Sequence, residues 1–317
     1  MTRHRAVVAL LLTALAALAF PAPLHAWTPG THIYLGEAIL ANLGSLPALA
    51  ADLLRAFPFD FLYGNIAADS SIAKKYAPVG RHCHSWHVGQ EIYDLARSDA
   101  LQAFGLGYLS HLAADVVAHN FFVPRQLVLT SSSTGFGHSY WESRFETPLG
   151  DRFARTAKEV ILLDHAPADA HLDQIIAPTI FSVRTNRRLF RGMVHLTETQ
   201  GWQRAFQVAE KRSRWDLPVR DVERHLALSF DYIMAMRAES PVVIPNGVAE
   251  PESEPRQLDP AGDHPLKIAK RMRREALLAG GWREPERLQA AAEEHFGLPD
   301  RPLQFWPEAT VKRPWAA

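Results

Sequence analysis

The sequence contains a single cysteine, Cys83, in 317 residues. One thiol excludes an internal disulfide framework and any CxxC zinc or redox motif. A basic excess is also lacking, because 34 Lys and Arg balance 34 Asp and Glu, and this argues against a dedicated nucleic-acid binder. Charged residues at 21% and aromatic residues at 10% exclude wholesale disorder. Histidine is abundant instead: there are fifteen, and seven of them lie between positions 32 and 138.

The segment 1–26 has the form of a secretory signal peptide. A basic start (Arg3, Arg5) precedes an apolar run over residues 6–20, and the small residue Ala26 ends the segment. The run is shorter than the about 20 apolar residues that a membrane-spanning helix needs. We therefore expect cleavage after Ala26, a mature protein that starts at Trp27, and export to the periplasm or the medium.

Most of the chain after position 27 has the helical period. Apolar residues recur at three- and four-residue steps, and alternating strand-like runs are nearly absent; 127–129 is too short to support a strand. The segment 131–137 is rich in Ser and Gly and predicts a flexible link. We predict one all-α domain over residues 27–245. Its expected helices lie at about 31–43, 46–56, 59–68, 85–97, 99–122, 138–160, 170–180, 184–212 and 218–238.

The last segment, 246–317, has a different composition. Of the 22 prolines, 11 follow position 240. Two amphipathic helices are possible within it, at 265–279 and 285–296. Without a second apolar core, this segment is predicted to be a Pro-rich, partly ordered C-terminal extension.

Three metal-binding side chains follow one another at four-residue intervals. His111, Asp115 and His119 lie within about 80° of one helical face, and their neighbours are Leu, Ala, Val and Phe. That face should point inward, where two imidazoles and a carboxylate need partners. A divalent metal is the strongest partner. A His–Asp–His hydrogen-bond network that only orients helices is the alternative, and this segment alone does not distinguish the two.

Two further segments offer ligand types in a weaker pattern. His138 and Glu142 are also four residues apart, but such a pair is by itself more typical of a solvated helix face. The segment 81–87 combines three imidazoles with a thiol, as a source of ligands or as a loose surface cluster. Asp69 ends an apolar helix, and its plain interpretation is a cap for the next segment. His32 lies five residues after Trp27.

The order of these motifs along the chain is more specific than any one of them. The residues concerned are Trp27, His32, Asp69, His84, His111, Asp115, His119, His138 and Glu142. In this order they resemble the zinc-dependent phospholipase C superfamily, which also contains the single-strand-specific S1 and P1 nucleases. The resemblance covers about 27–146. It implies a multi-helix phospholipase C/P1 nuclease-like fold and an exported zinc-dependent phosphoester hydrolase, in which a metal-activated water attacks the phosphodiester of a phospholipid.

The resemblance also implies two to three zinc ions in one cleft. The processed N-terminal tryptophan of the family binds zinc through its amine and carbonyl oxygen, and Trp27 matches it. Carried over by position, the ligands of one ion are Asp69, His84, His111 and Asp115. The ligands of a second ion are Trp27, His32 and a bridging Asp115. The ligands of a third ion are His119, His138 and Glu142.

Roles within this scheme are expectations of the same kind. Asp69 is the expected catalytic residue, beside the attacking water. Within 81–87 we favour His84 as the ligand and His82 as its alternative, with His87 peripheral. Cys83 is expected to be a packed thiol rather than a ligand.

The pattern departs from the family in ways that concern the substrate. Phospholipase members have a longer spacer between the residues that correspond to Asp115 and His119, and no lipid-binding β-sandwich follows the catalytic part. We expect a phospholipid or another phosphodiester as substrate, transient contact with a membrane surface, and no stable nucleic-acid partner. No basic stripe that would bind a long polynucleotide is evident apart from the basic residues at 187–191 and 270–274. An S1/P1-like nuclease and a non-catalytic zinc-binding exported protein are the alternatives, and the oligomeric state is open.

Overall fold

The computed structural model describes residues 27–72, 76–78, 81, 83–130, 134–197, 208, 210–211, 213, 215–239, 265–280 and 285–300. Every regular element within these ranges is a helix, so the all-α prediction is confirmed. The predicted signal peptide, 1–26, lies outside the described residues. Within the described part of the chain, no helix is both long enough and apolar enough to cross a bilayer.

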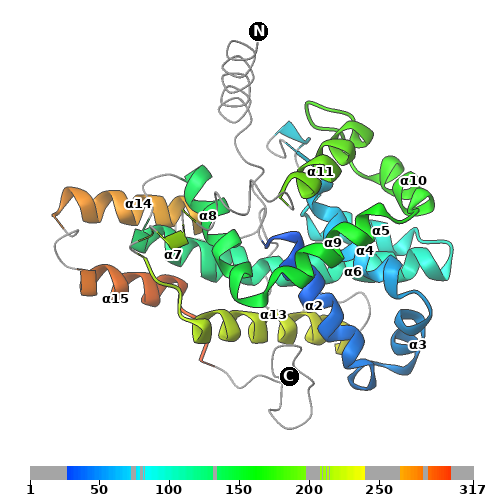
Figure 1. Ribbon diagram of the computed structural model, residues 1–317, viewed down its shortest axis with the longest axis horizontal. Coiled ribbons are helices and arrows are strands. Elements are labelled where there is room, and N and C mark those ends of the chain that lie inside the picture. Colours follow the sequence, from blue (N-terminus) through cyan, green and yellow to red (C-terminus); the bar gives the residue numbers. More distant parts are fainter. Residues whose placement is uncertain are drawn as a thin grey trace.

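The helices follow the predicted order and are arranged as Figure 1 shows. The first half of the chain contains α2 (Pro29–Ala41), α3 (Ala48–Ala56), α4 (Pro58–Ala67), α5 (Trp86–Asp94), α6 (Asp99–Val117), α7 (Val123–Thr130) and α8 (Thr134–Glu146). The second half contains α9 (Asp151–Leu162), α10 (Ala166–Ile175), α11 (Val183–Thr197), α13 (Val219–Glu239), α14 (Pro265–Leu278) and α15 (Pro285–Phe296).

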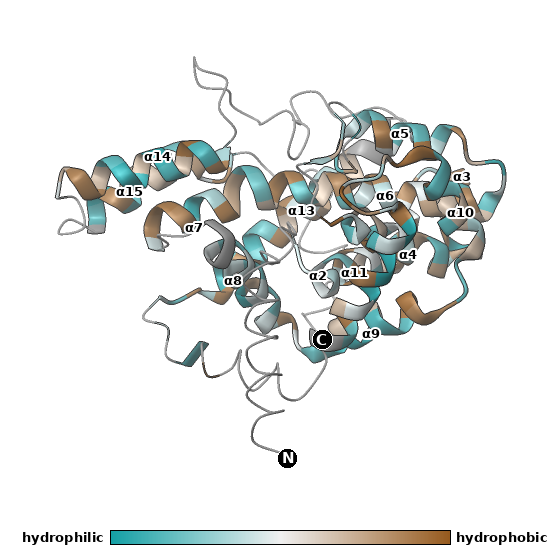
Figure 2. Cartoon of the chain, turned by 90° about the horizontal axis from the view of Figure 1, so that it is seen from above, coloured by the Kyte–Doolittle hydropathy of each residue, from teal (hydrophilic) through white to brown (hydrophobic). Residues whose placement is uncertain are grey.

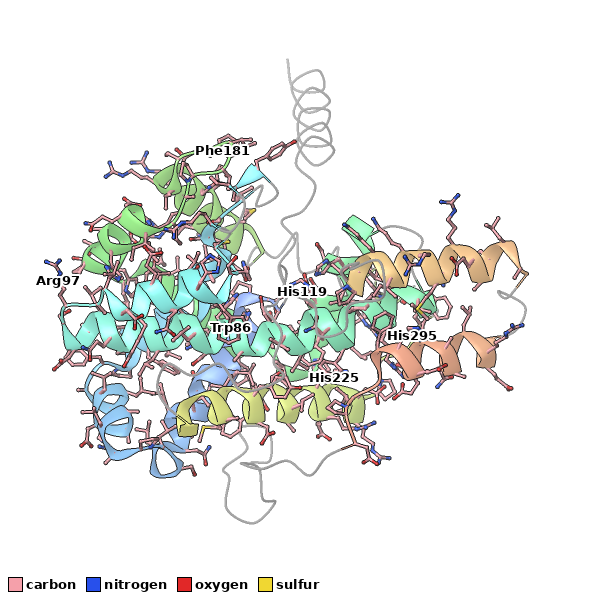
Figure 3. All side chains as sticks on the ribbon, turned by 180° about the vertical axis from the view of Figure 1, so that it is seen from behind. Trp86, Arg97, His119, Phe181, His225 and His295 are labelled. Carbon is pink, nitrogen blue, oxygen red and sulfur yellow. The ribbon has the colours of Figure 1, made fainter. Side chains whose placement is uncertain are left out.

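One run of helix, from α6 to α7, crosses the molecule. The two helices are joined by a π-helical turn, Ala118–Phe122. Residues 103–117 of α6 are all buried, because α3, α4, α5 and α13 pack around the helix. A helix that is apolar on all sides belongs in the interior. Figure 3 shows His119, from the π-helical turn, near the middle of the molecule.

Helices α4 and α6 cross at two glycines. A Cβ atom on Gly64 would lie 2.1 Å from the carbonyl oxygen of Phe104, and one on Gly107 would lie 2.1 Å from that of Phe61. The two backbones are therefore in direct contact, and no larger residue fits at either position. This close approach holds the end of α4, and the 3-10 turn Ala68–Ser70 that follows it, against α6.

The predicted helix 138–160 is wrong as a single element. The structure divides it into α8 and α9, separated by the 3-10 turn Thr147–Leu149 and by Gly150. Pro148 has no N–H to continue the helix, and Gly150 has a φ of 84° that favours glycine. The predicted link 131–137 is shorter than expected, because α8 already begins at Thr134.

The predicted helix 99–122 has the correct position, but it is not one continuous α-helix. Its α-helical part ends at Val117, the π-helical turn follows, and α7 continues to Thr130. The segment 127–129 is therefore helical. Of the predicted helix 184–212, the structure shows α11 to Thr197, and most of the remainder lies outside the described residues.

Both helices predicted in the C-terminal extension are present, and they pack on α7. Ile268 of α14 and Phe296 of α15 are buried within the same core as the rest of the molecule. Arg125 of α7 forms an ion pair with Glu293 at 2.7 Å. Figure 2 shows α14 and α15 together at one end of the long axis. The boundary at 245/246 stays a prediction.

Candidate metal centre

Five ligand-type side chains from four segments meet in the interior of the helical domain. His32 comes from α2, Asp69 from the 3-10 turn after α4, and His84 from the segment just before α5. His111 and Asp115 lie one turn apart on α6. All five side chains have an exposed fraction of 0%. The inward orientation predicted for His111 and Asp115 is therefore observed, and Asp69 is a buried acid rather than a helix cap.

The carboxylate of Asp115 lies between histidines on two sides. Its Oδ1 atom is 3.3 Å from Nε2 of His32. Its Oδ2 atom is 3.2 Å from Nε2 of His84 and 3.2 Å from Nε2 of His111. Each oxygen thus has its own imidazole neighbours, which is the arrangement of a carboxylate that bridges two cations.

Asp69 extends the cluster on the side of His84 and His111. Its Oδ1 atom is 3.3 Å from Nε2 of His84 and 3.9 Å from Nε2 of His111. The rings of His32 and His111 stack at 3.9 Å between centroids. Two groups therefore have ligand atoms that all lie within 4.8 Å of one another: His32, Asp69 and His111, and His84, His111 and Asp115.

The outer nitrogen atoms of two imidazoles contact groups that orient them. Nδ1–H of His111 donates to the carbonyl oxygen of Asn65 at 2.8 Å, so the lone pair of His111 is on Nε2 and faces the cluster. Nδ1 of His84 is 3.2 Å from Sγ of Cys83, and Cys83 is held by Tyr108, whose hydroxyl donates to the Cys83 carbonyl at 2.5 Å. Such outer contacts select the tautomer of a metal-binding histidine.

The charges in the cluster set the protonation states that ligands need. Burial acts to raise the pKa of Asp115, but His111, His32 and His84 outweigh it and hold that pKa well below its usual range. Burial, together with the neighbouring His111, lowers the pKa of His32 to about 4. At neutral pH the centre therefore contains an ionised carboxylate beside a neutral imidazole, as metal binding requires.

The donor atoms fit a divalent metal better than a closed hydrogen-bond network. Nε2 of His84 and Nε2 of His111 face each other at 3.1 Å, and at most one of two facing nitrogen atoms can donate. Nδ1 of His32 and both oxygens of Asp115 are buried, and they lack a hydrogen bond of acceptable geometry. Imidazole nitrogen and carboxylate oxygen are the ligands that zinc prefers at hydrolytic sites.

His119, His138 and Glu142 form a second buried group. The His119 and His138 rings are in edge-to-face contact at 5.3 Å, and Nε2 of His138 is 2.5 Å from Oε1 of Glu142. Glu142 is 2% exposed, so the solvated-face interpretation of this pair is wrong. The group is looser than the first, because among the described residues only the first cluster brings three ligand atoms within 4.8 Å of one another.

Trp27 lies against the turn of α6 that carries Asp115. Its Nε1–H donates to the carbonyl oxygen of Ala114 at 3.1 Å. Its ring stacks on Phe145 of α8 at 3.9 Å and is fully buried. The side chain of Trp27 thus anchors the start of the predicted mature chain beside the first cluster.

The segment 81–87 separates into buried and exposed residues. His84 and Cys83 are buried, whereas His87 is exposed. His82 lies outside the described residues. The structure therefore brings His84, the favoured residue, into the cluster and leaves His87 away from it.

Two contributions were not predicted from the sequence. The carbonyl oxygen of Asn65 orients His111, and a backbone group leaves no signal in the sequence. Glu146, at the end of α8, accepts hydrogen bonds from the Thr28 hydroxyl and, at 3.1 Å, from the backbone N–H of Thr31. A Cβ atom on Gly30 would lie 2.4 Å from the same carboxylate, so the glycine makes room for it.

An all-helical scaffold with a buried cluster of imidazoles and carboxylates is typical of a domain that binds a divalent metal. Residues 31–178 match the family model described as zinc-dependent phospholipase C. The match confirms the resemblance drawn from the motifs, and the family that it names implies a zinc-dependent phosphodiester hydrolase. The segment contains every candidate ligand except Trp27. No curated protein and no solved structure matches the chain.

Proposed function

We propose that the protein is an exported phospholipase C-like enzyme that hydrolyses the phosphodiester bond of a phospholipid. One observation carries this proposal: the two oxygens of the buried Asp115 face different histidines at 3.2–3.3 Å. A bridging carboxylate of this kind is suited to a pair of zinc ions. Zinc pairs are typical of centres that displace groups at phosphorus.

The proposed ligands form two sites, one beside each carboxylate oxygen of Asp115. On its Oδ2 side, Asp69, His84 and His111 complete one site. On its Oδ1 side, His32 and the amine and carbonyl of a terminal Trp27 complete the other. The hydrogen bond from Trp27 to Ala114 supports this second site, because it holds the proposed terminus next to Asp115. His119, His138 and Glu142 are the proposed ligands of a third ion.

Zinc, when bound, lowers the pKa of a coordinated water toward neutrality and neutralises charge on the phosphate. The residues of the chain prepare this chemistry. Asp115 remains ionised, because its pKa is held low, and His32 remains neutral at the pH of the reaction. Asp69, on the same side as His84 and His111, is the proposed catalytic residue that orients the attacking water or accepts its proton.

Export is part of the proposal, because the second site requires a free amine at Trp27. The basic, apolar and small-residue segments of 1–26 support it. N-terminal sequencing of the exported protein should therefore begin at Trp27. A mature protein that begins at another residue contradicts both export by cleavage after Ala26 and the terminal ligand.

The activity test compares the centre with an exposed histidine nearby. Asp115→Asn keeps the shape of the side chain but removes the negative charge that two cations would share. We expect it to abolish hydrolysis of p-nitrophenyl phosphorylcholine, with a loss of at least about 100-fold in kcat/KM. His87→Gln is the matched control, because His87 belongs to the same histidine-rich segment but is exposed, and it should retain activity.

The substrates then separate the candidate functions. Hydrolysis of phosphatidylcholine without cleavage of single-stranded DNA supports the proposal. Cleavage of single-stranded DNA with intact phosphatidylcholine favours the nuclease. Activity that survives Asp115→Asn overturns the catalytic assignment.

A further inference from the structure

Helix α14 has a face of basic side chains that point into solvent. The helix contains five basic residues and one acidic residue, Glu275. Lys267, Lys270, Arg271 and Arg274 are exposed, and their spacing of three and four residues puts them on one side of the helix. We refer to these four residues as the cationic face of α14.

The opposite side of α14 holds the helix in place. Ile268 and Ala269 are buried in the core, and α14 packs on α7 and α15. Arg273, between the two sides, donates to the carbonyl oxygen of Val128 at 2.6 Å. The orientation of the cationic face is therefore fixed by packing.

Two leucines at the end of α14 are exposed beside these charges. Leu277 is 40% exposed and Leu278 is 79% exposed. Basic side chains next to uncovered apolar ones are the pattern of helices that lie on anionic lipid surfaces. Figure 2 shows hydrophilic and hydrophobic bands along α14, at one end of the molecule.

The position of α14 links this face to the candidate centre. The helix contacts the π-helical turn Ala118–Phe122, which carries His119. It also lies outside the segment 31–178 that matches the family. The cationic face thus lies outside the segment that matches the family model, at the side of the second ligand group.

We propose that the cationic face of α14, with Leu277 and Leu278, docks the protein on a membrane surface that contains anionic phospholipid. The inference rests on the proposed function in one respect: docking presents the phospholipid substrate to the enzyme. The lysine and arginine side chains contact lipid phosphates and carboxylates, and the leucines enter the boundary between head groups and acyl chains.

Lipid fits this surface better than nucleic acid. Proteins that bind single strands combine basic grooves with aromatic side chains on which bases stack. Helix α14 contains no aromatic residue, and its exposed apolar side chains are both leucines. Exposed leucine side chains favour contact with lipid hydrocarbon over contact with stacked bases.

The experiment measures binding of the zinc-loaded protein to sedimented vesicles, with and without phosphatidylserine in phosphatidylcholine. The test variant is Lys267→Gln/Lys270→Gln/Arg274→Gln. The matched control is Arg184→Gln/Arg188→Gln/Arg220→Gln, which removes the same charge from exposed positions on α11 and α13. Each basic residue near an anionic surface contributes roughly fivefold to binding, so the test variant should bind phosphatidylserine vesicles roughly 100-fold more weakly. The control should bind as the wild type does.

A second variant tests the contribution of the exposed leucines to vesicle binding. Leu278→Ser should weaken vesicle binding by roughly fivefold, because an exposed leucine would lose its transfer into the membrane. Salt should weaken wild-type binding, as expected for screened surface charges. Equal binding of test variant and control overturns the proposal, as does equal wild-type binding to vesicles with and without phosphatidylserine. A single-stranded oligonucleotide that binds through these residues and displaces the vesicles also overturns it, in favour of nucleic acid.

Hydrolysis of soluble p-nitrophenyl phosphorylcholine separates this inference from the proposed function. The test variant should retain that activity, because none of its residues belongs to the centre. Charge-dependent vesicle binding without any phospholipid hydrolysis leaves docking intact and removes the phospholipase. If phospholipid is hydrolysed but the test variant binds vesicles as well as the control does, the proposed function stands and docking through α14 is removed.

Discussion

Asp115 and its histidine neighbours stabilise one another's protonation states. A buried carboxylate would ordinarily become protonated, but the imidazoles around Asp115 keep its pKa low. His32 remains neutral because burial and His111 oppose its charge. The cluster therefore has negative charge and available lone pairs in a dry site, which is a favourable environment for a divalent cation.

Cys83 provides a test of how the outer contacts orient the ligands. Cys83→Val removes the thiol next to Nδ1 of His84, so the ring loses a hydrogen-bonding group that favours one tautomer. We expect zinc affinity to fall by about 10- to 100-fold, measured by competition with a chromogenic chelator. Zinc affinity should fall less in Cys83→Ser, because serine keeps a hydrogen-bonding group at this position. Unchanged affinity in Cys83→Val would show that the thiol does not orient His84.

At the scale of single residues, the sequence predicted the types of ligand better than their environment. His111 and Asp115 were expected to face inward because their neighbours on the same helix are apolar. His138 and Glu142 lacked that local signal, and their burial depends on packing that helix periodicity does not report. The oxygen of Asn65 was unpredictable for a different reason: any residue offers a backbone carbonyl.

At the scale of the helices, the crossing of α4 and α6 determines the distance between Asp69 and His111. Gly107→Ala places a methyl group 2.1 Å from the Phe61 carbonyl oxygen, so the helices must separate. We expect the free energy of unfolding to fall by about 3 kcal/mol, measured by denaturant titration. Gly192→Ala in α11 is the control, because a Cβ there has nothing within 4 Å. It should raise stability by about 1 kcal/mol. Equal effects of the two substitutions would contradict a tight crossing.

Helical periodicity predicted most elements but not their interruptions. The break between α8 and α9 was missed because the apolar period continues across it, although Pro148 and Gly150 are break signals that the sequence does show. The π-helical turn that carries His119 was missed for a similar reason. One additional residue in a helical turn alters the hydrogen-bond register, and the residue types in the sequence do not show it.

At the scale of the whole molecule, α13 brings a titratable group into the aromatic core. The His225 ring lies edge-on to Phe122 at 5.2 Å, and Figure 3 shows its place on α13. Burial lowers the pKa of His225 from 6.5 to about 4. The unfolded chain therefore binds more protons than the folded one between these two values, so stability falls as the pH falls from 6.5 to 4.

His225→Phe removes this contribution and keeps an aromatic ring in place. Between pH 7 and pH 4 the variant should lose about 3 kcal/mol less unfolding free energy than the wild type. Denaturant titrations of both proteins at the two pH values measure the difference. Parallel losses in the two proteins would show that His225 is not buried in its neutral form.

The two described helices of the C-terminal extension belong to the same packed molecule as the helical domain. The amphipathic pattern of 265–279 and 285–296 predicted the two helices, but it could not show that they pack on α7, since the partner surface is more than a hundred residues away in sequence. Ile268 and Phe296 enter the common core. Helices α14 and α15 therefore cover α7, the helix that leads away from the candidate centre.

The zinc content of the mature protein reports directly on a metal centre built around Asp115. We expect at least two zinc ions per chain in elemental analysis of the dialysed protein, and fewer in Asp115→Asn, whose amide side chain lacks the negative charge that two cations would share. His87→Gln should retain the wild-type content. A wild-type protein that contains no zinc after equilibration with the metal, or an Asp115→Asn variant with the full wild-type content, would contradict a zinc centre built around Asp115.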